Sequence, residues 1–240
     1  MKALINIVLI GILIICVWSG YKKGIVMGVG GLIVIVVALW AANLVAATYS
    51  DEVLSVMRPF ASGFVDAQLT GDDGVMERMG WGETDYSAAD MLAVYPERIQ
   101  EFCSECYQSI GIYSTAADEI AEDAVALYIS GYGEVIDCVS EALCENASYV
   151  AFFILAFLLI LIILTVIGNL PNLSYKIPNL DIANNIGGTL LGLATGMCFC
   201  IILVWFLKFA GIIIGEDTLS SAGLASLMLK LDFVQKIVGI

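Results

Sequence analysis

The sequence predicts an all-α polytopic membrane protein, with four transmembrane helices in two hairpins, a helical soluble insert and a C-terminal amphipathic helix. Three observations lead to this fold class. Hydrophobic residues make up 60% of the 240 residues, well above the roughly 45–50% of soluble domains. Apolar stretches long enough to cross a bilayer recur along the chain. Between the second and third of them the composition becomes acidic and polar.

The first hairpin is predicted over residues 1–47. Residues 3–18 are apolar and would rise about 24 Å as a helix, while residues 25–47 are long enough to span about 30 Å of hydrocarbon. The polar stretch GYKKG at residues 20–24 separates them, so the two helices should be antiparallel. A cleaved signal peptide is the alternative for the first helix, but no small-x-small cleavage site follows it.

Residues 48–148 have the composition of a soluble insert. They hold 20 of the 24 acidic residues and three of the ten basic ones, a net charge of −17. Because phosphate binding needs clustered Lys and Arg, this surface argues against a nucleic-acid partner.

The insert should be helical. Pro96 suits a first helical position, and Ser114 or Thr115 could cap a second helix that has an acidic first turn. The turn-rich residues 71–84 are predicted to be loop. The expected buried faces are Ile99, Phe102, Cys103, Cys106 and Ile110 in the first helix, and Val135, Cys138, Val139 and Ala142 in a third.

The second hairpin is predicted over residues 149–214 and the tail over residues 215–240. Residues 149–168 are apolar and uncharged, and a polar connection with two prolines separates them from a fourth span. In the tail, apolar residues recur at helical spacing against Lys and Asp. This pattern indicates an amphipathic helix lying on the membrane surface.

Two rows of glycines four residues apart form the candidate helix-packing motif. The rows are Gly20, Gly24 and Gly28, and Gly188, Gly192 and Gly196. Such spacing puts a row on one helix face, where backbones can approach closely, and this approach drives helix association in lipid. Each row should open the second helix of a hairpin and pack against neighbouring spans of the same chain or of a second copy. The alternative is that glycine is simply frequent in membrane helices.

Four of the seven cysteines lie in the insert and are candidate disulfides: Cys103, Cys106, Cys138 and Cys144. Antiparallel packing of their helices would pair Cys106 with Cys138 and Cys103 with Cys144. Cys144 is the weak point, because six residues after Cys138 it is rotated about 120° from it. Free buried thiols are the main alternative. A zinc site is disfavoured, since the gaps do not match the paired spacings of zinc ribbons.

The sequence offers little for catalysis. It contains no histidine, which is the commonest general base and metal ligand. The spans lack the charged groups that mark an ion path, and Lys208 can reach the interface on its own stem. Cys103 and Cys106 have the spacing of a thiol redox motif but fall within a predicted helix. We therefore expect no enzymatic activity, catalytic residue, cofactor or metal.

The short connections carry the positive charge that sets topology. Lys22, Lys23 and Lys176 are predicted to be cytoplasmic anchors. Both termini and the insert would then lie outside the cytoplasm, and the even set of insert cysteines favours an oxidising exterior.

Several of these residues resemble the colicin V production protein (CvpA) family. They are Asn6, the GYKKG turn, and the register Asn184-x-x-x-Gly188-x-x-x-Gly192-x-x-x-Gly196, and the resemblance covers roughly residues 1–47 and 149–230. The acidic insert lies outside the family pattern. Asn6 and Asn184 stand where the family usually has Asp, and Thr195 stands where it commonly has a basic residue.

The resemblance implies a multi-pass protein of the bacterial cytoplasmic (inner) membrane. Its role would be that of an accessory or scaffold protein in toxin production or export, as of a colicin V-like bacteriocin, and in envelope maintenance. The expected partners are the lipid bilayer and other membrane proteins or further copies in a homo-oligomer. The alternative function is an oligomeric channel or transporter component, although Asn6, Thr165 and Thr189 supply few midplane polar groups.

Overall fold

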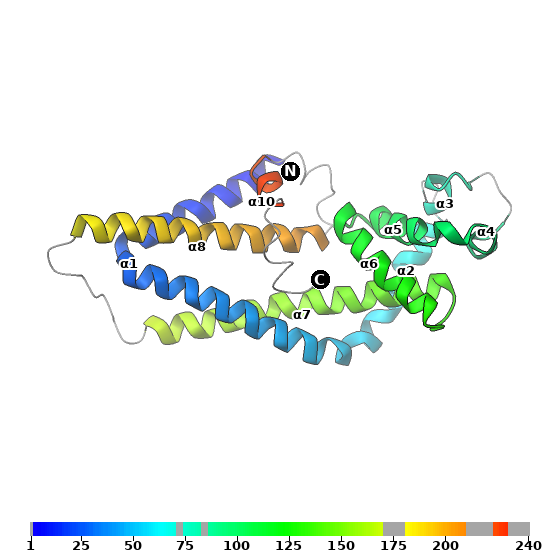
Figure 1. Cartoon of the computed structure of the whole chain (residues 1–240), viewed down its shortest axis with the longest axis horizontal. Helices are drawn as coiled ribbons and strands as arrows, with labels where there is room; N and C mark the ends of the chain where they lie inside the picture. The colour runs from blue at the N-terminus through cyan, green and yellow to red at the C-terminus, as the bar shows by residue number, and fades with distance from the viewer. Residues whose placement is uncertain (1, 71–73, 83–85, 170–180, 210–222, 230–240) are drawn as a thin grey trace. The chain divides into compact units, whose positions relative to one another are not determined.

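The structure, a computed structural model, describes residues 2–70, 74–82, 86–169, 181–209 and 223–229 (Figure 1). All regular structure in these ranges is helical, as predicted. The elements are α1 (Lys2–Tyr49), η1 (Ser50–Val53), α2 (Leu54–Thr70), α3 (Val75–Arg78), α4 (Ala88–Val94), η2 (Pro96–Arg98), α5 (Ile99–Ile110), α6 (Ser114–Ile129), α7 (Val135–Asn169), α8 (Asp181–Phe209) and α10 (Gly223–Leu229).

Three helical stretches in the described residues are long and apolar enough to cross a membrane. They are Ala3–Leu69, Val135–Gly168 and Ile182–Phe209. A helix needs about 20 predominantly apolar residues to span hydrocarbon, and each stretch contains them. These helices are compatible with a membrane protein.

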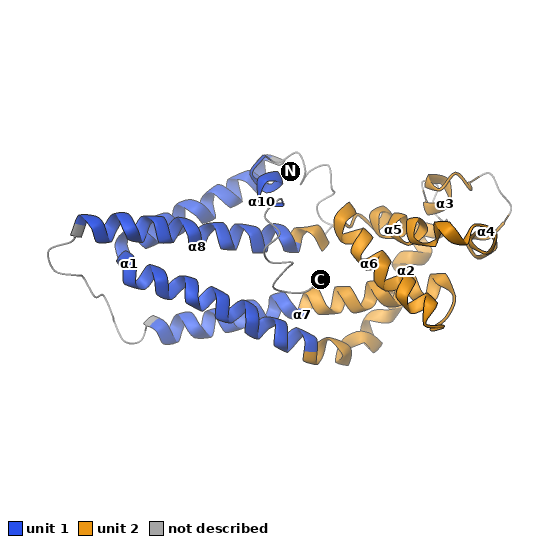
Figure 2. Cartoon of the chain, in the orientation of Figure 1, with its two compact units in different colours: residues 1–47, 152–206, 217–240 blue, residues 48–151, 207–216 orange. Residues whose placement is uncertain are grey.

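The chain divides into two compact units (Figure 2). Unit 1 contains residues 1–47, 152–206 and 217–240, and unit 2 contains residues 48–151 and 207–216. Unit 2 thus holds the acidic segment predicted as an insert over residues 48–148. Residues 207–209, which were assigned from the sequence to the second hairpin, are grouped with unit 2 in this division.

Within unit 1, α1 is broken at a single residue. Gly24 has φ 76° and ψ −176°, and two helical segments meet there. Residues 20–23 were expected to lie in a non-helical turn, but they continue the first segment as helix. The turn is therefore shorter than predicted, because one glycine with positive φ is enough to redirect the backbone.

The helices of unit 1 bury one side and expose large apolar side chains on the other. Phe153 of α7 and Trp205 of α8 pack edge to face with ring centroids 5.3 Å apart, and both are buried. By contrast Ile15, Ile162 and Leu190 are more than 60% exposed. Exposed apolar surface of this kind marks a lipid-facing or partner-facing exterior.

Unit 2 has its own hydrophobic core. Phe102, Cys106 and Tyr107 of α5 are fully buried, and the Tyr107 hydroxyl donates to the carbonyl of Val139 at 2.9 Å. The predicted faces are confirmed, since the buried residues include Ile99, Phe102, Cys103, Cys106, Val135, Cys138, Val139 and Ala142, with Ile110 partly buried against them. This packing explains why a strongly acidic segment folds, because every described carboxylate of the segment except that of Glu141 is at least partly exposed.

Two local predictions in unit 2 need correction. Helix α6 begins at Ser114, but its N-cap is Tyr113, whose side chain makes no cap hydrogen bond. The Tyr113 N–H instead donates to the carbonyl of Lys208 at 3.1 Å. In addition, residues 75–78, expected as loop, form the short helix α3.

The predicted tail helix is described only in part. Helix α10 buries Ala225 and Met228 and leaves Leu227 53% exposed. The remaining tail positions of the predicted amphipathic helix lie outside the described residues.

Candidate functional site

The two predicted glycine rows meet in unit 1, where α8 lies alongside the first segment of α1 (Figure 1). A Cβ added to Gly20 would lie 2.8 Å from the Cα of Gly192 and against the carbonyl oxygen of Gly188. A Cβ added to Gly188 would lie 2.7 Å from the Cα of Gly24. Carbon atoms in ordinary contact are about 3.5–4.0 Å apart, so these backbones touch without room for a side chain.

This contact, which we call the glycine seam, continues along α8 in antiparallel order. A Cβ on Gly196 would lie 3.1 Å from both the Cβ of Cys16 and a methyl of Leu13. Further on, the Cys200 thiol donates to the carbonyl of Leu9 at 3.6 Å. The seam is thus tightest near the break of α1 and becomes ordinary side-chain packing away from it.

The first glycine row does not occupy one helix face, contrary to the sequence prediction. Because α1 breaks at Gly24, Gly20 and Gly28 belong to different segments. Gly28 faces a side chain, with its added Cβ 2.8 Å from the Cβ of Leu191. The row in α8 is uninterrupted, since residues 181–209 form one helix.

Asn184 holds the break of α1 in place. Its side-chain oxygen accepts a hydrogen bond from the Ile25 backbone N–H at 2.9 Å, and the residue is 5% exposed. The second segment of α1 starts at the break, so its first N–H groups lack intrahelical acceptors. A Cβ on Gly24 would lie 2.7 Å from this same oxygen. Gly24 is therefore required for its positive φ and for the space that Asn184 fills.

Sequence reasoning missed this role of Asn184, which entered only as part of a family register. The spacing could have indicated this role. Asn184 precedes Gly188 by four residues, so its amide lies on the glycine face of the helix and must contact the helix that packs against that face. The other family-register asparagine, Asn6, has a side-chain oxygen that is buried without a hydrogen-bond partner among the described residues.

A cavity of about 370 Å³ lies in unit 1 beside the seam. It is lined by both segments of α1, the end of α7 and the middle of α8: Ile15, Cys16, Ser19, Gly20, Lys23, Met27, Gly28, Gly30, Gly31, Val34, Ile35, Leu161, Leu164, Thr165, Gly168, Gly192, Thr195 and Phe199. Gly30, Gly31 and Gly168 have open space around them, since an added Cβ would meet nothing within 4 Å. These three glycines do not serve close packing within the described structure.

One predicted cytoplasmic anchor lies at this cavity and another lies next to it. Lys23 lines it, and Lys22 lies with its ammonium 5.1 Å from the ring centroid of Trp18. A second hollow beside the first is lined by Trp18, Lys22 and Lys23, and shares Ile15 and Ser19 with it. The third anchor, Lys176, lies outside the described residues.

The insert cysteines are free thiols in the structure. Cys103, Cys106, Cys138 and Cys144 are all buried, and neither pair of the predicted nested disulfides is formed among these described residues. The Cys138 thiol donates to the Gly133 carbonyl at 3.9 Å, and the Cys144 thiol donates to the Leu54 carbonyl at 3.5 Å. From their spacing, Cys144 is rotated away from Cys138 on their helix. In the structure the Cys144 thiol bonds to α2, whereas its predicted disulfide partner, Cys103, lies in α5.

Burial makes these thiols poor nucleophiles. It raises the pKa of Cys103 to about 12, and it raises the pKa of Cys106 further. Because the thiolate is the reactive form, a pKa this high keeps both cysteines inert at neutral pH. The four act as small apolar core residues.

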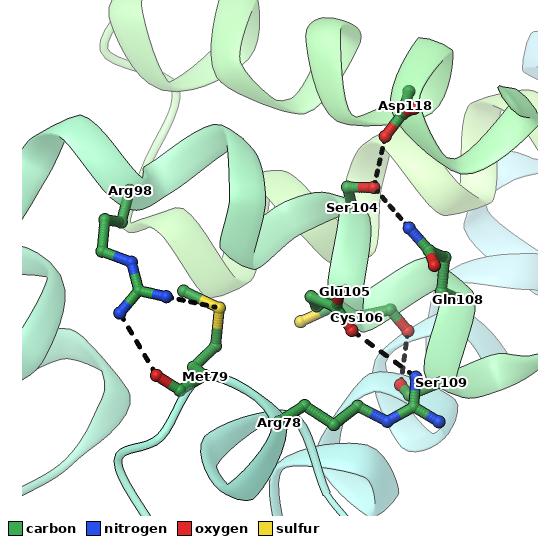
Figure 3. A network of polar contacts seen from close by, with 9 residues as sticks. All are labelled: Arg78, Met79, Arg98, Ser104, Glu105, Cys106, Gln108, Ser109 and Asp118. Carbon is green, nitrogen blue, oxygen red and sulfur yellow. Dashed lines mark hydrogen bonds and ion pairs between the residues drawn. The ribbon is translucent and has the colours of Figure 1, made fainter. Parts of the chain in front are cut away.

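The polar side chains of unit 2 join its helices to one another. The guanidinium of Arg58 in α2 donates to both carboxylate oxygens of Glu141 in α7, at 2.6 and 2.8 Å. This hydrogen bonding lowers the pKa of Glu141, which is 6% exposed. Ser104 of α5 donates to Asp118 of α6 at 2.5 Å (Figure 3). These bonds fix helix register and do not converge on a pocket.

Lys208, which was expected to extend toward the interface, is only 7% exposed. No group of three or more His, Cys, Asp or Glu residues in the described ranges has the geometry to hold a metal ion. No family model, curated protein or solved structure matches the chain. The resemblance to the colicin V production family therefore stays a prediction, and function has to be argued from the glycine seam and its cavity.

Proposed function

We propose that the protein is a multi-pass membrane scaffold, in which a four-span core in two hairpins presents the acidic helical insert. The observation that carries this proposal is that the polar side chains of three residues in unit 1 form hydrogen bonds with the protein backbone. The Asn184 amide caps α1, and the hydroxyls of Thr189 and Thr195 donate to backbone carbonyls within α8, each at 2.8 Å. The Asn184 amide is thus used between two helices and the threonine hydroxyls within their own helix, whereas a transporter aims such groups at a substrate.

The break at Gly24 supports four spans. It divides α1 into residues 2–23 and 25–49, which would rise about 33 and 37 Å. Gly20 lies before the break and Gly28 after it, yet both contact residues 188–192 of α8. Both segments of α1 therefore contact the same part of α8. This supports a first hairpin in which the chain turns back at Gly24.

The lysines support one orientation. Lys22 and Lys23 adjoin the break, and the cavity that Lys23 lines also reaches Gly168 near the end of α7. We propose that this end faces the bacterial cytoplasm, because short Lys-rich connections stay inside. The insert would then be extracytoplasmic. Since the insert thiols are free, the disulfide argument from the sequence adds no support to this side.

Labelling on intact cells tests the orientation. Tyr86 of the insert is 67% exposed, so a Tyr86→Cys thiol should react with an impermeant maleimide on intact cells. Lys22→Cys should react only after the membrane is permeabilised. The native thiols of the insert are buried, and a chain without substitutions measures their background. Reaction of Lys22→Cys but not Tyr86→Cys on intact cells would reverse the topology.

Crosslinking and deletion test the scaffold role. A photo-crosslinking residue at position 86 of the insert should capture another envelope protein, whereas the same residue at the exposed Ile162 of unit 1 should not. If the role implied by the resemblance is carried by this chain, deletion strains should secrete less peptide toxin and be more sensitive to detergent. Normal secretion and envelope integrity would remove that role.

A channel or transporter component is the second candidate, and the cavity in unit 1 is the observation that favours it. Purified protein in liposomes should then conduct ions or release a trapped solute. A Gly31→Leu variant, which would fill the cavity, should abolish that flux. If the unsubstituted protein produces no flux, the channel proposal fails and the scaffold proposal stands.

A further inference from the structure

We propose that the cavity of unit 1 binds one acyl chain of an anionic phospholipid, whose phosphate lies at Lys22 and Lys23. The inference is independent of the scaffold function. It uses three features of the site: the cavity's size and lining, the glycines that keep it open, and the charge beside it.

The cavity is large enough for a ligand and mostly apolar in its lining. Its volume of about 370 Å³ falls within the roughly 300–1,000 Å³ of small-molecule sites. The apolar lining includes Val34, Ile35, Leu161 and Phe199. An apolar chain gains by filling such a space, whereas a polar solute would lose its hydration there.

Glycines hold the cavity open without serving close packing. An added Cβ on Gly30, Gly31 or Gly168 would meet nothing within 4 Å, in contrast to the glycines of the seam. Glycine within a helix is less favourable than alanine, so two adjacent glycines in α1 destabilise that helix. In exchange, the missing side chains of Gly30 and Gly31 leave space, and this space is part of the cavity.

The charge beside the cavity selects an anion. Lys23 lines the cavity and Lys22 lines the adjoining hollow with Trp18. In the ranges that the structure describes, no ion pair involves either lysine. An aromatic ring beside lysines is typical of the level of lipid headgroups. Basic pockets between membrane helices bind anionic headgroups.

The occupant is a bilayer lipid because the side chains around the site are lipid-facing. Ile15 is 69% exposed, Trp18 is 62% exposed and Ile33 is 58% exposed. A phospholipid already lies with its headgroup at the interface and its chains in the hydrocarbon. It could therefore enter from the side without crossing water.

Native mass spectrometry of the purified full-length protein tests the site. Protein is exchanged into detergent containing equal amounts of phosphatidylglycerol and phosphatidylcholine, and the lipid-bound species are counted. We expect one retained phosphatidylglycerol and a preference over phosphatidylcholine of about thirty-fold, because each lysine near a membrane surface adds roughly five-fold attraction for anionic lipid. Lys22→Gln with Lys23→Gln should reduce the preference to near one, and arginine at both positions should restore it.

Cavity-filling variants separate chain binding from surface attraction. Gly30→Leu should lose the retained lipid, and Gly11→Leu should keep it, because Gly11, in the first segment of α1, also has open space around it but does not line the cavity. Gly168→Leu fills the cavity from α7 and provides a second test if Gly30→Leu fails to fold. Retention of lipid by folded filled variants would overturn the proposal. If the protein is instead a lipid-free dimer, and the cavity-filling variants are monomers, the occupant of the cavity is a second copy of the chain and the lipid proposal is wrong.

Discussion

The glycine seam can be tested by a single methyl group. Gly188→Ala places a Cβ against three backbone atoms: the carbonyl oxygen of Gly20, and the Cα and carbonyl carbon of Gly24 at 2.7 and 2.8 Å. None of these atoms belongs to a side chain that could adopt another rotamer. Since carbon contacts need about 3.5–4.0 Å, the two helices must separate by about 1 Å.

The expected loss of stability follows from three contributions. Overpacking of this size costs about 1–3 kcal/mol. Separation also lengthens the Asn184 to Ile25 hydrogen bond, now 2.9 Å, whose loss costs about 0.5–1.5 kcal/mol. Alanine is a better helix former than glycine by about 1 kcal/mol, which offsets part of this. The net expectation is a decrease of about 0.5–3.5 kcal/mol in the free energy of unfolding.

Reversible unfolding in mixed micelles measures this quantity, with helicity followed by circular dichroism as sodium dodecyl sulfate is increased. Gly11→Ala is the matched control, because its added Cβ meets nothing within 4 Å. It should leave stability unchanged or slightly higher. A Gly188→Ala protein as stable as Gly11→Ala would refute the reasoning, since it would mean that the backbones are not in contact.

Three further predictions concern single groups. Asn184→Leu should destabilise the protein more than Asn184→Asp, because only Asp keeps an acceptor for the Ile25 N–H, and the same micelle titration compares them; equal losses would contradict the cap. The pKa of Glu141 is lowered in the folded state from its ordinary value of 4.5 by Arg58. Its contribution is therefore complete above about pH 4.5 and is lost as pH falls through the lower folded value, so thermal scans of Glu141→Gln should show a weaker acid dependence than wild type. Cys103 should react with a maleimide at neutral pH much more slowly in the folded than in the unfolded chain, and rapid reaction when folded would contradict its burial.

The sequence predicted those parts of the fold that depend on local pattern. The buried faces of α5 and the start of α7 could be read from helical spacing, because a face that repeats every three or four residues has to be covered. The row from Gly188 to Gly196 could be read as a packing face for the same reason. Apolar length was enough to indicate the long membrane-type helices.

What could not be predicted depends on contacts between distant residues. Gly20, Gly24 and Gly28 are equivalent in sequence, and only the Asn184 side chain distinguishes Gly24 as the break. The insert cysteines suggested crosslinks, but a buried cysteine that packs as a small apolar residue has the same sequence spacing as one that forms a disulfide. The cavity was missed because Gly30 and Gly31 do not continue the four-residue rows.

The hydrogen bond between Ile25 and Asn184 has a consequence for biosynthesis. Its two partners are 159 residues apart, so the ribosome needs roughly 8–30 s to make the second after the first. During that interval the Ile25 N–H lacks the acceptor it has in the folded chain, at a helix start where the first N–H groups have no intrahelical partner. The nascent N-terminal segments therefore depend on water or another transient acceptor at this N–H until α8 has been made.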